Sequence, residues 1–428
     1  MKKIVAMLLS VTLALGACAG CSSKPASSAP GSTPAASAPT GEKVKLDVMW
    51  FSDGKEGETF RRLADQYEAE KGNVEIEIIE VPYDDMTDKI KNMLNAKKAP
   101  ALARLSSAGV FENQLVNLYD YVEDKDAFKA NFTNALKIDY NGKMIGAPMD
   151  VTANGLMYNK TAFDKAGVKV PQSPEEVWTW EEWKEAMKTV MEKGGVKYGL
   201  VYDRSPQRFS TLLYQAGGQM LKDDLSGSAF NSPETARAVN FFKELHDEKI
   251  IADSVWLGSE NPNNLFRTGQ VAMHFSGNWV VSNYKDEIKD FEWGVTYLPK
   301  DKTRATVPGG KYIGAFQGSG VEKEAVEFIE WLSRPEINAQ YCMENNFISP
   351  VVGNEKLDYA YGAEFFEIFS NELANTSEIP GREWGSQDIV NKYDTDMREE
   401  LIKVLAGKLT TDEYMKQMEE RINKACAK

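Results

Sequence analysis

The segment that decides the fold is Gly142–Trp183, GKMIGAPMDVTANGLMYNKTAFDKAGVKVPQSPEEVWTWEEW. It follows Asn141, and the dipeptide Asn141-Gly142 predicts a two-residue type I′ hairpin between LKIDY and KMIGAPM. An extended apolar run from Val151 to Met157 then leads into YNKTAFDKAG, which predicts a short helix ending at Gly167. The segment therefore alternates between strand and helix.

Two helix starts complete the segment. Pro174 follows Ser173 and occupies a first helical position, where its missing N–H leaves no hydrogen bond unmade. Thr179 and Glu182 have the spacing of a capping box, in which each side chain bonds to the backbone N–H of the other residue. Both patterns predict helices on the carboxyl side of Gly167.

The chain before this segment predicts an α/β lobe. Alternating and helix-spaced apolar residues indicate a strand, a helix, a strand, a helix and a strand at Lys43–Phe51, Glu58–Lys71, Val74–Val81, Asp85–Ala96 and Leu102–Leu105. This order is typical of a largely parallel sheet. Such sheets bind ligands at the carboxyl ends of their strands. We therefore expect the following residues to lie near one another: Trp50, Phe51, Asp53, Ser106 and Ser107.

The chain after the segment continues the alternation. It predicts helices after Ser232-Pro233, at Asn264–Thr268 and at Ala325–Leu332. It predicts strands at Gln270–Phe275 and Phe291–Leu298. The chain is thus expected to form a second α/β lobe.

The order and identity of residues in these segments resemble those of the extracellular solute-binding proteins of ABC importers. Within that family, the resemblance is to the carbohydrate-binding group that includes maltose-binding protein. That family shows roughly G-K-x-Y-G-x-P, then G-L-x-Y-N-K-x-x-F-x-K-A-G, then P-x-T-W-x-E. The residues in those places here are Gly142, Lys143, Gly146, Pro148, Gly155, Leu156, Tyr158, Asn159, Lys160, Phe163, Lys165, Ala166, Gly167 and Trp180.

The resemblance covers essentially the whole chain after residue 41. Phe266-x-x-Gly269-x-Val271-Ala272-Met273 with Gly277-x-Trp279 is similar to the family's F-x-x-G-x-x-A-M and G-x-W. Trp293-Gly294-Val295, Leu298-Pro299 and Gly309-Gly310 match the stretch before the chain returns to the first lobe. One departure is Pro100-Ala101, where the family usually has P-D and its aspartate helps to close the end of the sheet.

The resemblance implies an α/β, two-lobed periplasmic-binding-protein type II fold with discontinuous lobes and a hinge. We expect lobe 1 at residues 42–150 and 316–350, and lobe 2 at residues 151–315 and 351–428. The chain should cross between lobes near Asp150–Thr152, near Ala315–Gln317, and again after the helix that follows Pro335.

The N-terminus indicates a lipoprotein. Residues 1–17 carry Lys2 and Lys3 followed by an apolar run too short to span a bilayer about 30 Å thick. Leu15-Gly16-Ala17-Cys18 resembles a lipobox, which implies cleavage before Cys18 and lipidation of its thiol, with Cys21 as a second acceptor. Residues 18–41 are rich in Ser, Ala and Pro and predict a flexible tether. We expect a lipid-anchored protein on the outer face of a Gram-positive membrane.

The composition limits the classes of binding partner that the protein is expected to have. The formal net charge is −14, which argues against binding nucleic acid or lying on an anionic membrane, so the lipid anchor is the one expected membrane contact. No second apolar segment is long enough to span a membrane. Cys342 and Cys426 are far apart in sequence and are expected to be thiols. We expect a monomer without a cofactor.

Aromatic and planar polar side chains are the candidate ligand contacts, because sugars present apolar C–H faces and rings of hydroxyls. Trp279 follows a Gly-Asn turn and matches the family's tryptophan that stacks on ligand. Trp384 lies in Pro380–Gly385, which we expect to be a glycine-flanked loop facing the cleft. The alternative for both tryptophans is core packing.

Further candidates come from the strand ends, the lobe crossing and the loops. Each also has a non-functional alternative, which is core packing for the aromatic residues and a solvated surface position for the charged ones. They are Trp50, Phe51, Ser106, Asp150, Arg204, Arg208, Trp256, Tyr312 and Arg382. Tryptophans at helical spacings are expected to be structural: Trp178, Trp180, Trp183 and Trp331.

The sequence contains little that indicates a catalytic or metal site. His246 and His274 are the chain's two histidines, too few for a zinc cluster or a histidine-based triad of the usual kind. Asp223-Asp224 and Asp394-x-Asp396 lack the loop spacing of a calcium site. We expect no catalytic residue and no metal, although a pair of carboxylates for glycoside hydrolysis stays open among 64 acidic residues.

The sequence thus predicts a protein that captures a carbohydrate, an oligosaccharide, and delivers it to an ABC permease by hinge closure. Binding of another solute, such as glycerol phosphate, a polyamine or iron, is the first alternative. A surface glycosidase is the second.

Overall fold

One continuous sheet joins both halves of the chain. The computed structural model describes residues 43–427, with gaps at 53, 134–135, 137 and 141. Among these residues the strand order is β2-β1-β3-β8-β4-β6-β5, and β7 also pairs with β4. The strands are β1 (Val44–Trp50), β2 (Val74–Glu80), β3 (Leu102–Leu105), β4 (Ala147–Asn159), β5 (Tyr198–Tyr202), β6 (Val271–Gly277), β7 (Trp293–Thr296) and β8 (Pro308–Ala315).

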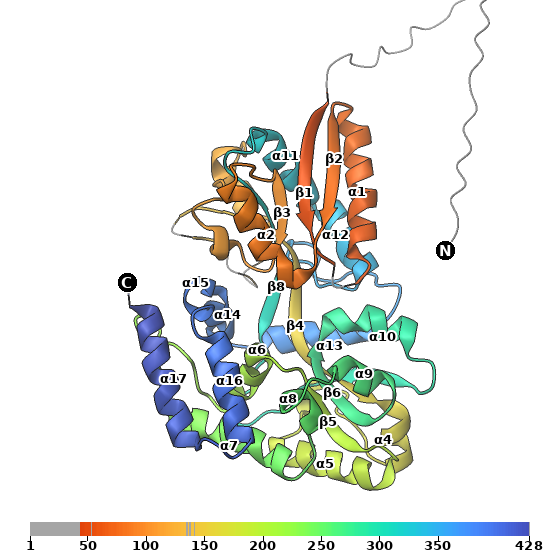
Figure 1. Cartoon of the computed structure of the whole chain (residues 1–428). Coiled ribbons are helices and arrows are strands. Elements are labelled where there is room, and N and C mark those ends of the chain that lie inside the picture. The colour runs from red at the N-terminus through yellow and green to blue at the C-terminus, as the bar shows by residue number, and fades with distance from the viewer. Residues whose placement is uncertain (1–42, 53, 134–135, 137, 141, 428) are drawn as a thin grey trace, which may run out of the picture. The chain divides into compact units, whose positions relative to one another are not determined.

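The first half forms the predicted parallel α/β arrangement. β1 pairs in parallel with both β2 and β3, and α1 (Glu56–Lys71) and α2 (Tyr83–Asn95) connect them. Two late helices, α11 (Glu322–Leu332) and α12 (Pro335–Asn345), return to this half, where α12 packs on α1 and α11 packs on β1 and β8 (Figure 1). Short helices complete it: η1 (Ala108–Phe111), η2 (Leu118–Asp120) and α3 (Lys125–Ala130).

Apolar side chains cover both faces of this half of the sheet. Leu46, Val48 and Trp50 belong to one cluster, while Met49 and Phe51 belong to another, as alternation along a strand requires. We call these two clusters the N-terminal cores, and their members fall within residues 46–149 and 312–351. β1 therefore has no face free for a ligand.

The sheet end near Pro100-Ala101 is intact without the family's aspartate. The N–H of Ala101 donates to Asp47 Oδ1 at 2.8 Å, and the Ala101 carbonyl accepts from the Phe316 N–H at 3.1 Å. β3 follows at once and pairs with β1 and β8. The carboxylate of a neighbouring strand thus bonds to the backbone here.

The second half builds on β5, β6 and β7. β5 and β6 are parallel, and β4 runs antiparallel to β6 and β7. Its apolar residues form one C-terminal core within residues 153–307 and 365–425. The elements around it are α4 (Lys160–Ala166), η3 (Pro174–Glu176), α5 (Trp180–Lys193), α6 (Pro206–Gln215), α7 (Pro233–Asp247), α8 (Asp253–Trp256), α9 (Pro262–Arg267), η4 (Asn278–Val280), α10 (Val281–Glu287), α13 (Ala363–Ala374), α14 (Glu378–Gly385), α15 (Gln387–Val390), α16 (Asp394–Leu405) and α17 (Thr411–Cys426).

The local signals of the Gly142–Trp183 segment act as predicted. α4 ends at Gly167, whose φ of 69° is left-handed and suits glycine. Thr179 and Glu182 form the capping box of α5. Tyr140 and Lys143 exchange backbone hydrogen bonds around the expected hairpin, although Asn141 itself lies outside the described residues.

Two strands, β4 and β8, connect the halves (Figure 1). The first part of β4 pairs antiparallel with β8, and its second part pairs with β6 and β7. Core membership changes between Met149 and Ala153 on β4, and between Val307 and Tyr312 on β8. We expected the crossing near Ala315–Gln317. The change of core on β8 comes earlier, because β8 already pairs with β3 at Tyr312.

A third connection follows α12. The Val151 N–H donates to the Ile348 carbonyl at 2.8 Å, so this segment lies against β4 at the crossing. Phe347 and Val351 pack in the N-terminal cores, whereas Ile348 packs against the C-terminal core. Three segments therefore pass between the halves.

Gly310 allows the crossing strands to approach closely. A Cβ atom on Gly310 would lie 2.2 Å from the backbone oxygen of Asp150, a distance that real Cβ contacts do not reach. On neighbouring Gly309 the nearest atom would be the side-chain oxygen of Thr152 at 2.9 Å. The first contact can be relieved only by moving backbone, and the second by turning a side chain.

We expect Gly310→Ala to lower the free energy of unfolding by about 1–3 kcal/mol, the usual cost of overpacking. Gly309→Ala is the matched control and should cost less. Urea denaturation of the two variants and the parent protein measures both values. Equal losses for the two variants would contradict a backbone clash at Gly310.

Candidate functional site

A pocket of about 600 Å³ lies between side chains of the N-terminal half, the crossing strands and the C-terminal half. This volume is in the range of small-molecule and cofactor sites. The N-terminal half contributes Tyr83, Thr87, Lys91, Ser106, Ser107, Val110, Leu136 and Tyr140. The crossing strands contribute Thr152 and Pro308–Tyr312. The C-terminal half contributes Ser205, Gln207, Arg208, Trp279, Gly381, Trp384, Gly385, Gln387, Asn391 and Asp394.

Trp279 forms one aromatic wall of this pocket. Its half-buried ring packs against both the C-terminal core and one N-terminal core. The ring lies over Gly277, where a Cβ atom would be 1.9 Å from Trp279 Cζ3. The Gly-Asn turn noted in the sequence is therefore what lets the tryptophan lie in this position.

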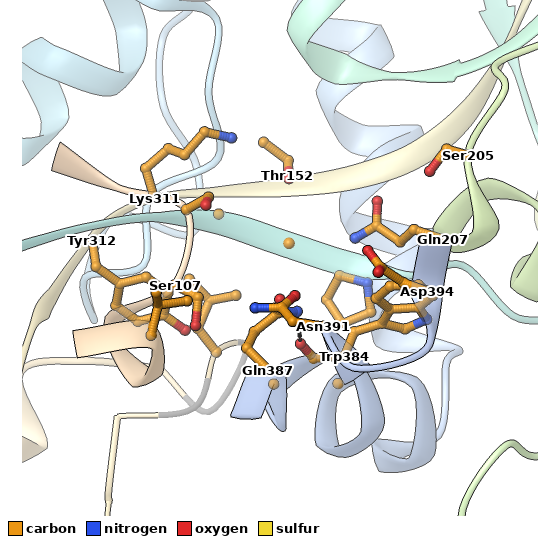
Figure 2. Close-up of a pocket in the computed structure, with 18 of the residues that line it drawn as sticks. Ser107, Thr152, Ser205, Gln207, Lys311, Tyr312, Trp384, Gln387, Asn391 and Asp394 are labelled. Atoms are coloured by element: carbon orange, nitrogen blue, oxygen red, sulfur yellow. Dashed lines mark hydrogen bonds between the residues drawn. The ribbon is translucent and has the colours of Figure 1, made fainter. Parts of the chain in front are cut away.

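Trp384 forms a second aromatic wall. Its indole Nε1 donates to Ser210 Oγ at 2.9 Å, and its carbonyl accepts from Gln387 Nε2 at 2.5 Å (Figure 2). The expected loop here is a helix, α14 (Glu378–Gly385). Pro380 is compatible with it because a proline in the first turn interrupts no intrahelical hydrogen bond.

A buried carboxylate anchors α14. Glu383 accepts hydrogen bonds from Tyr214 Oη at 2.7 Å and from the N–H groups of Leu221 and Met220 at 2.7 and 2.9 Å. Burial raises the pKa of Glu383 to about 7. These contacts fix Trp384, the next residue, relative to the C-terminal core.

Polar side chains also line the pocket. Figure 2 shows Thr152 and Lys311 on the crossing strands, with Gln387 and Asn391 from the C-terminal helical region across the pocket. Hydroxyl, amide, ammonium and carboxylate groups are all present, and Asp394 is the one carboxylate among the described lining residues. Such a set can exchange several hydrogen bonds with a ligand rich in hydroxyls.

Several predicted ligand residues do line the pocket. Ser106 follows β3, Tyr312 lies on β8 and Arg208 lies on α6. Burial raises the pKa of the Tyr312 hydroxyl well above its ordinary range. Together with Trp279 and Trp384, these five of the predicted ligand residues lie at one site.

Trp50, Phe51 and Trp256 do not line this pocket. Trp50 is fully buried and stacks on Phe60 with ring centroids 3.9 Å apart, because α1 covers its face of β1. Trp256 is buried in the C-terminal core and donates to the Tyr202 carbonyl at 3.0 Å. Phe51 is buried beside a separate cavity of about 190 Å³ that it shares with Ser106. At these positions the structure shows the core packing that the sequence analysis left open as the alternative.

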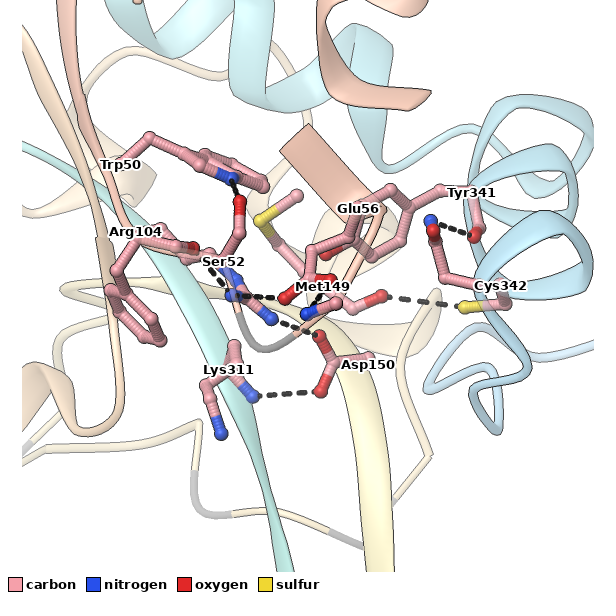
Figure 3. Close-up of polar contacts among 12 residues, drawn as sticks. Trp50, Ser52, Glu56, Arg104, Met149, Asp150, Lys311, Tyr341 and Cys342 are labelled. Carbon is pink, nitrogen blue, oxygen red and sulfur yellow. Dashed lines mark hydrogen bonds and ion pairs between the residues drawn. The ribbon is translucent and has the colours of Figure 1, made fainter. Parts of the chain in front are cut away.

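Asp150 is a structural carboxylate rather than an exposed acceptor. It is fully buried, with Oδ2 3.7 Å from Arg104 Nη2 and Oδ1 accepting from the Lys311 backbone N–H at 3.1 Å (Figure 3). Arg104 also donates to the Phe51 carbonyl at 2.7 Å and to Glu56 Oε1 at 2.9 Å. The buried charges tie β1, α1 and β3 to the crossing strands.

Arg204 and Arg382 also lie elsewhere. Arg204 is exposed at the surface and donates to the Gly258 carbonyl at 2.9 Å. Arg382 pairs with Asp223 at 3.0 Å and faces a neighbouring cavity of about 860 Å³. Asp53, expected near this site, lies outside the described residues.

Sequence reasoning missed much of the polar lining. Gln387, Asn391 and Asp394 are spaced i, i+4, i+7, which places them on one side of a helical path. That spacing was a usable signal, but a polar stripe is also typical of a solvated helix face. Tyr83 and Lys91 on α2 were missed for the same reason.

Metal-binding clusters are not found among the described residues. In that part of the chain, no three His, Cys, Asp or Glu side chains gather where they could hold an ion. Asp396 pairs with Arg421 at 2.7 Å, and Asp224 accepts from the Ser226 N–H at 3.0 Å. Over the same residues, no helix is both long enough and apolar enough to cross a membrane.

Known proteins with similar sequences are binding proteins. The family model described as bacterial extracellular solute-binding protein matches residues 62–355. The melibiose/raffinose/stachyose-binding protein MelE of Bacillus subtilis is 23% identical over 350 residues, which cover 77% of this chain and 79% of that protein. The sn-glycerol-3-phosphate-binding protein UgpB of Pectobacterium atrosepticum is 22% identical over 421 residues, covering 90% and 92%.

Solved structures show the same fold. An ABC substrate-binding protein from Listeria monocytogenes, in complex with cycloalternan, superposes with a TM-score of 0.79. It is 24% identical, and the match covers 90% of this chain and 99% of that one. The two-lobed fold inferred from the sequence is thereby confirmed. The family model matches more than half of the length of this chain. The chain therefore belongs to the bacterial extracellular solute-binding proteins.

Proposed function

We propose that this protein captures an oligosaccharide outside the cell and delivers it to the permease of an ABC importer. The main supporting observation is the pocket of about 600 Å³, whose lining combines Trp279 and Trp384 with hydroxyl and amide side chains. Aromatic faces suit the C–H faces of sugar rings, and amides and hydroxyls suit their hydroxyl groups. The relatives named for raffinose and cycloalternan support the same class of ligand.

Capture would proceed by closure about the three connecting segments. We propose that residues 43–150 with 312–350 and residues 151–307 with 351–427 move as two lobes, with residues 308–311 in the β8 crossing. A ligand that contacts both sides of the pocket favours the closed arrangement by its differential affinity. The closed form would then be the one that the permease recognises, with the binding protein acting as a monomer.

Isothermal titration against raffinose, stachyose, maltotriose and cycloalternan tests the ligand class. We expect at least one of them to bind, and we expect Trp279→Ala to weaken that binding tenfold or more, about 1.4 kcal/mol, by removing an aromatic wall of the pocket and the ring against which Arg208 lies. Trp178→Ala is the matched control, because Trp178 packs half-buried on the C-terminal core away from the described pocket lining. If none of the four sugars binds, the oligosaccharide assignment is wrong.

Glycerol 3-phosphate is the second candidate ligand. A specific observation favours it: Lys91, Arg208 and Lys311 all line the pocket, and UgpB is similar over 90% of this chain. Titration with glycerol 3-phosphate under the same conditions separates it from the sugars. The large aromatic walls favour the sugars, since a phosphate needs converging cations rather than stacking faces.

We propose that the bound sugar is released intact. Glycoside hydrolysis generally uses two carboxyl groups that flank the bond, and Asp394 is the one carboxylate among the described lining residues. Incubating the protein with fluorescently labelled maltotriose and separating the products checks this. A shortened labelled sugar would make the protein a glycosidase.

We also propose that the N-terminal cysteine of the mature protein, Cys18, carries the lipid anchor on the outer face of the membrane. We expect Cys18→Ser to abolish incorporation of labelled palmitate and to release the protein from the membrane fraction. Cys21→Ser, the matched control, should keep both. Loss of labelling in Cys21→Ser alone would move the anchor to Cys21.

A further inference from the structure

We infer that Arg208 is a fixed ligand-facing donor of the pocket, and that Asp203, His274 and Ser276 beneath it are its positioning residues. The inference rests on the proposed function only in taking the pocket as the ligand site. Asp203, His274 and Ser276 do not line the described pocket, and no sequence pattern connected them with binding. Their contacts form one chain that leads to Arg208.

Arg208 lies flat against the aromatic wall. Its guanidinium carbon is 4.2 Å from the centroid of the Trp279 ring, and its side chain is 16% exposed. Nη1 donates to Gln207 Oε1, while Nη2 has no hydrogen-bond partner among the described residues. The N–H groups of a guanidinium lie in one rigid plane. Contacts on one edge of that plane therefore set the direction of the N–H groups on the other edge.

Asp203 forms an ion pair with the Nε edge of that plane, beyond hydrogen-bond distance. Its Oδ2 lies 3.6 Å from Arg208 Nε and accepts a hydrogen bond from Ser276 Oγ at 2.7 Å. Its Oδ1 is 2.7 Å from His274 Nε2. Burial acts to raise the pKa of Asp203, but His274, Arg208 and Ser276 together hold it below its ordinary range. The group facing Arg208 is therefore a carboxylate with both oxygens engaged.

The strand pattern explains why these groups meet. Asp203 follows β5, and His274 and Ser276 are two residues apart on the neighbouring parallel strand β6. Residues two apart on a strand point to the same face, so both side chains reach the one carboxylate. Arg208 lies on the next helix, α6, and accepts at its carbonyl from Tyr202 Oη at 2.7 Å.

His274 is held in turn from the far side. The ring is fully buried, and its Nδ1 lies 2.6 Å from the Tyr284 hydroxyl. Tyr284 donates to Asn263 Oδ1 at 2.9 Å. Since the Asp203 carboxylate only accepts, Nε2 of His274 donates to it, and because the one Tyr284 hydroxyl proton goes to Asn263, the Tyr284 oxygen accepts from Nδ1. α9 and α10 thereby keep the imidazole, and through it Asp203, from turning.

The consequence for binding is a preorganised donor. An oxygen of a sugar placed beside Trp279 would meet Arg208 N–H groups whose direction is already fixed, so little side-chain entropy is lost on binding. Arg208 would thereby select sugars that present an acceptor oxygen at that point of the ring. Arg204, four residues earlier, is exposed and cannot have this role.

The first test needs no ligand. The protein is labelled with 5-fluorotryptophan, and the Trp279 resonance is assigned in the ¹⁹F NMR spectrum with Trp279→Phe. We expect Asp203→Asn to shift or broaden that resonance, because Arg208 leaves the ring. Asp253→Asn is the matched control, since Asp253 pairs with His246 at 2.8 Å away from the pocket. A Trp279 resonance that is unchanged in Asp203→Asn overturns the inference.

Ser276→Ala is the milder second variant in case Asp203→Asn does not fold. It removes one hydrogen bond to Asp203 and leaves the Arg208 ion pair and the His274 contact in place, so a smaller change of the same Trp279 resonance is expected. An unchanged resonance in a folded Ser276→Ala protein, with Asp203→Asn unfolded, counts against the inference.

The second test is a double-mutant cycle on affinity for whichever of raffinose, stachyose and maltotriose binds. Asp203→Asn should weaken binding at least tenfold in the parent and hardly at all in an Arg208→Ala background, because it acts through Arg208. Losses that add in full would overturn the positioning role. If no sugar binds, the proposed function fails, and the ¹⁹F spectrum still decides the arrangement of Arg208.

Discussion

The antiparallel pairing of β4 with β8 is the constraint on which the rest of the structure depends. These two strands belong to the sheet of the first half at one end and to the second half at the other. Their backbones approach so closely that residue 310 has no room for a side chain. The pocket lies beside this crossing and takes Thr152, Lys311 and Tyr312 from it. A change in the angle between the strands would therefore change the distance between the pocket walls.

Buried charge reinforces the crossing. Arg104, Glu56 and Asp150 are all removed from water, and the interior offers them hydrogen bonds and ion pairs in exchange. Removing one partner from such a set leaves a buried charge uncompensated, a cost of about 3–5 kcal/mol. The set therefore specifies how β1, α1 and β3 meet the crossing strands. The Arg208–Asp203–His274 chain has the same character in the second half, where it serves the pocket.

Most helices and strands could be predicted from local sequence signals. Most residues of the candidate site could not, because their positions depend on tertiary packing. Gly167 and the Thr179–Glu182 capping box act within a few residues, so the sequence predicts them well. Trp279 and Trp384 were found because a turn and a family pattern marked them. The roles of Trp50 and Asp150 stayed open in the sequence because their burial depends on α1 and on Arg104, which come from other parts of the chain. Gln387 and Asn391 resemble ordinary surface residues until the fold brings them to the pocket.

We propose that the two halves close about the β4–β8 crossing around an oligosaccharide. It is tested by the distance between spin labels at Asp88→Cys on α2 and Lys392→Cys beyond α15, with and without a saturating sugar. The background carries Cys18→Ser, Cys21→Ser and Cys426→Ser, and Cys342 is buried. The account predicts that the sugar shortens and narrows this distance distribution, while a pair within one half, Asp88→Cys with Lys71→Cys, keeps its own. An unchanged Asp88–Lys392 distance with the sugar bound would contradict it.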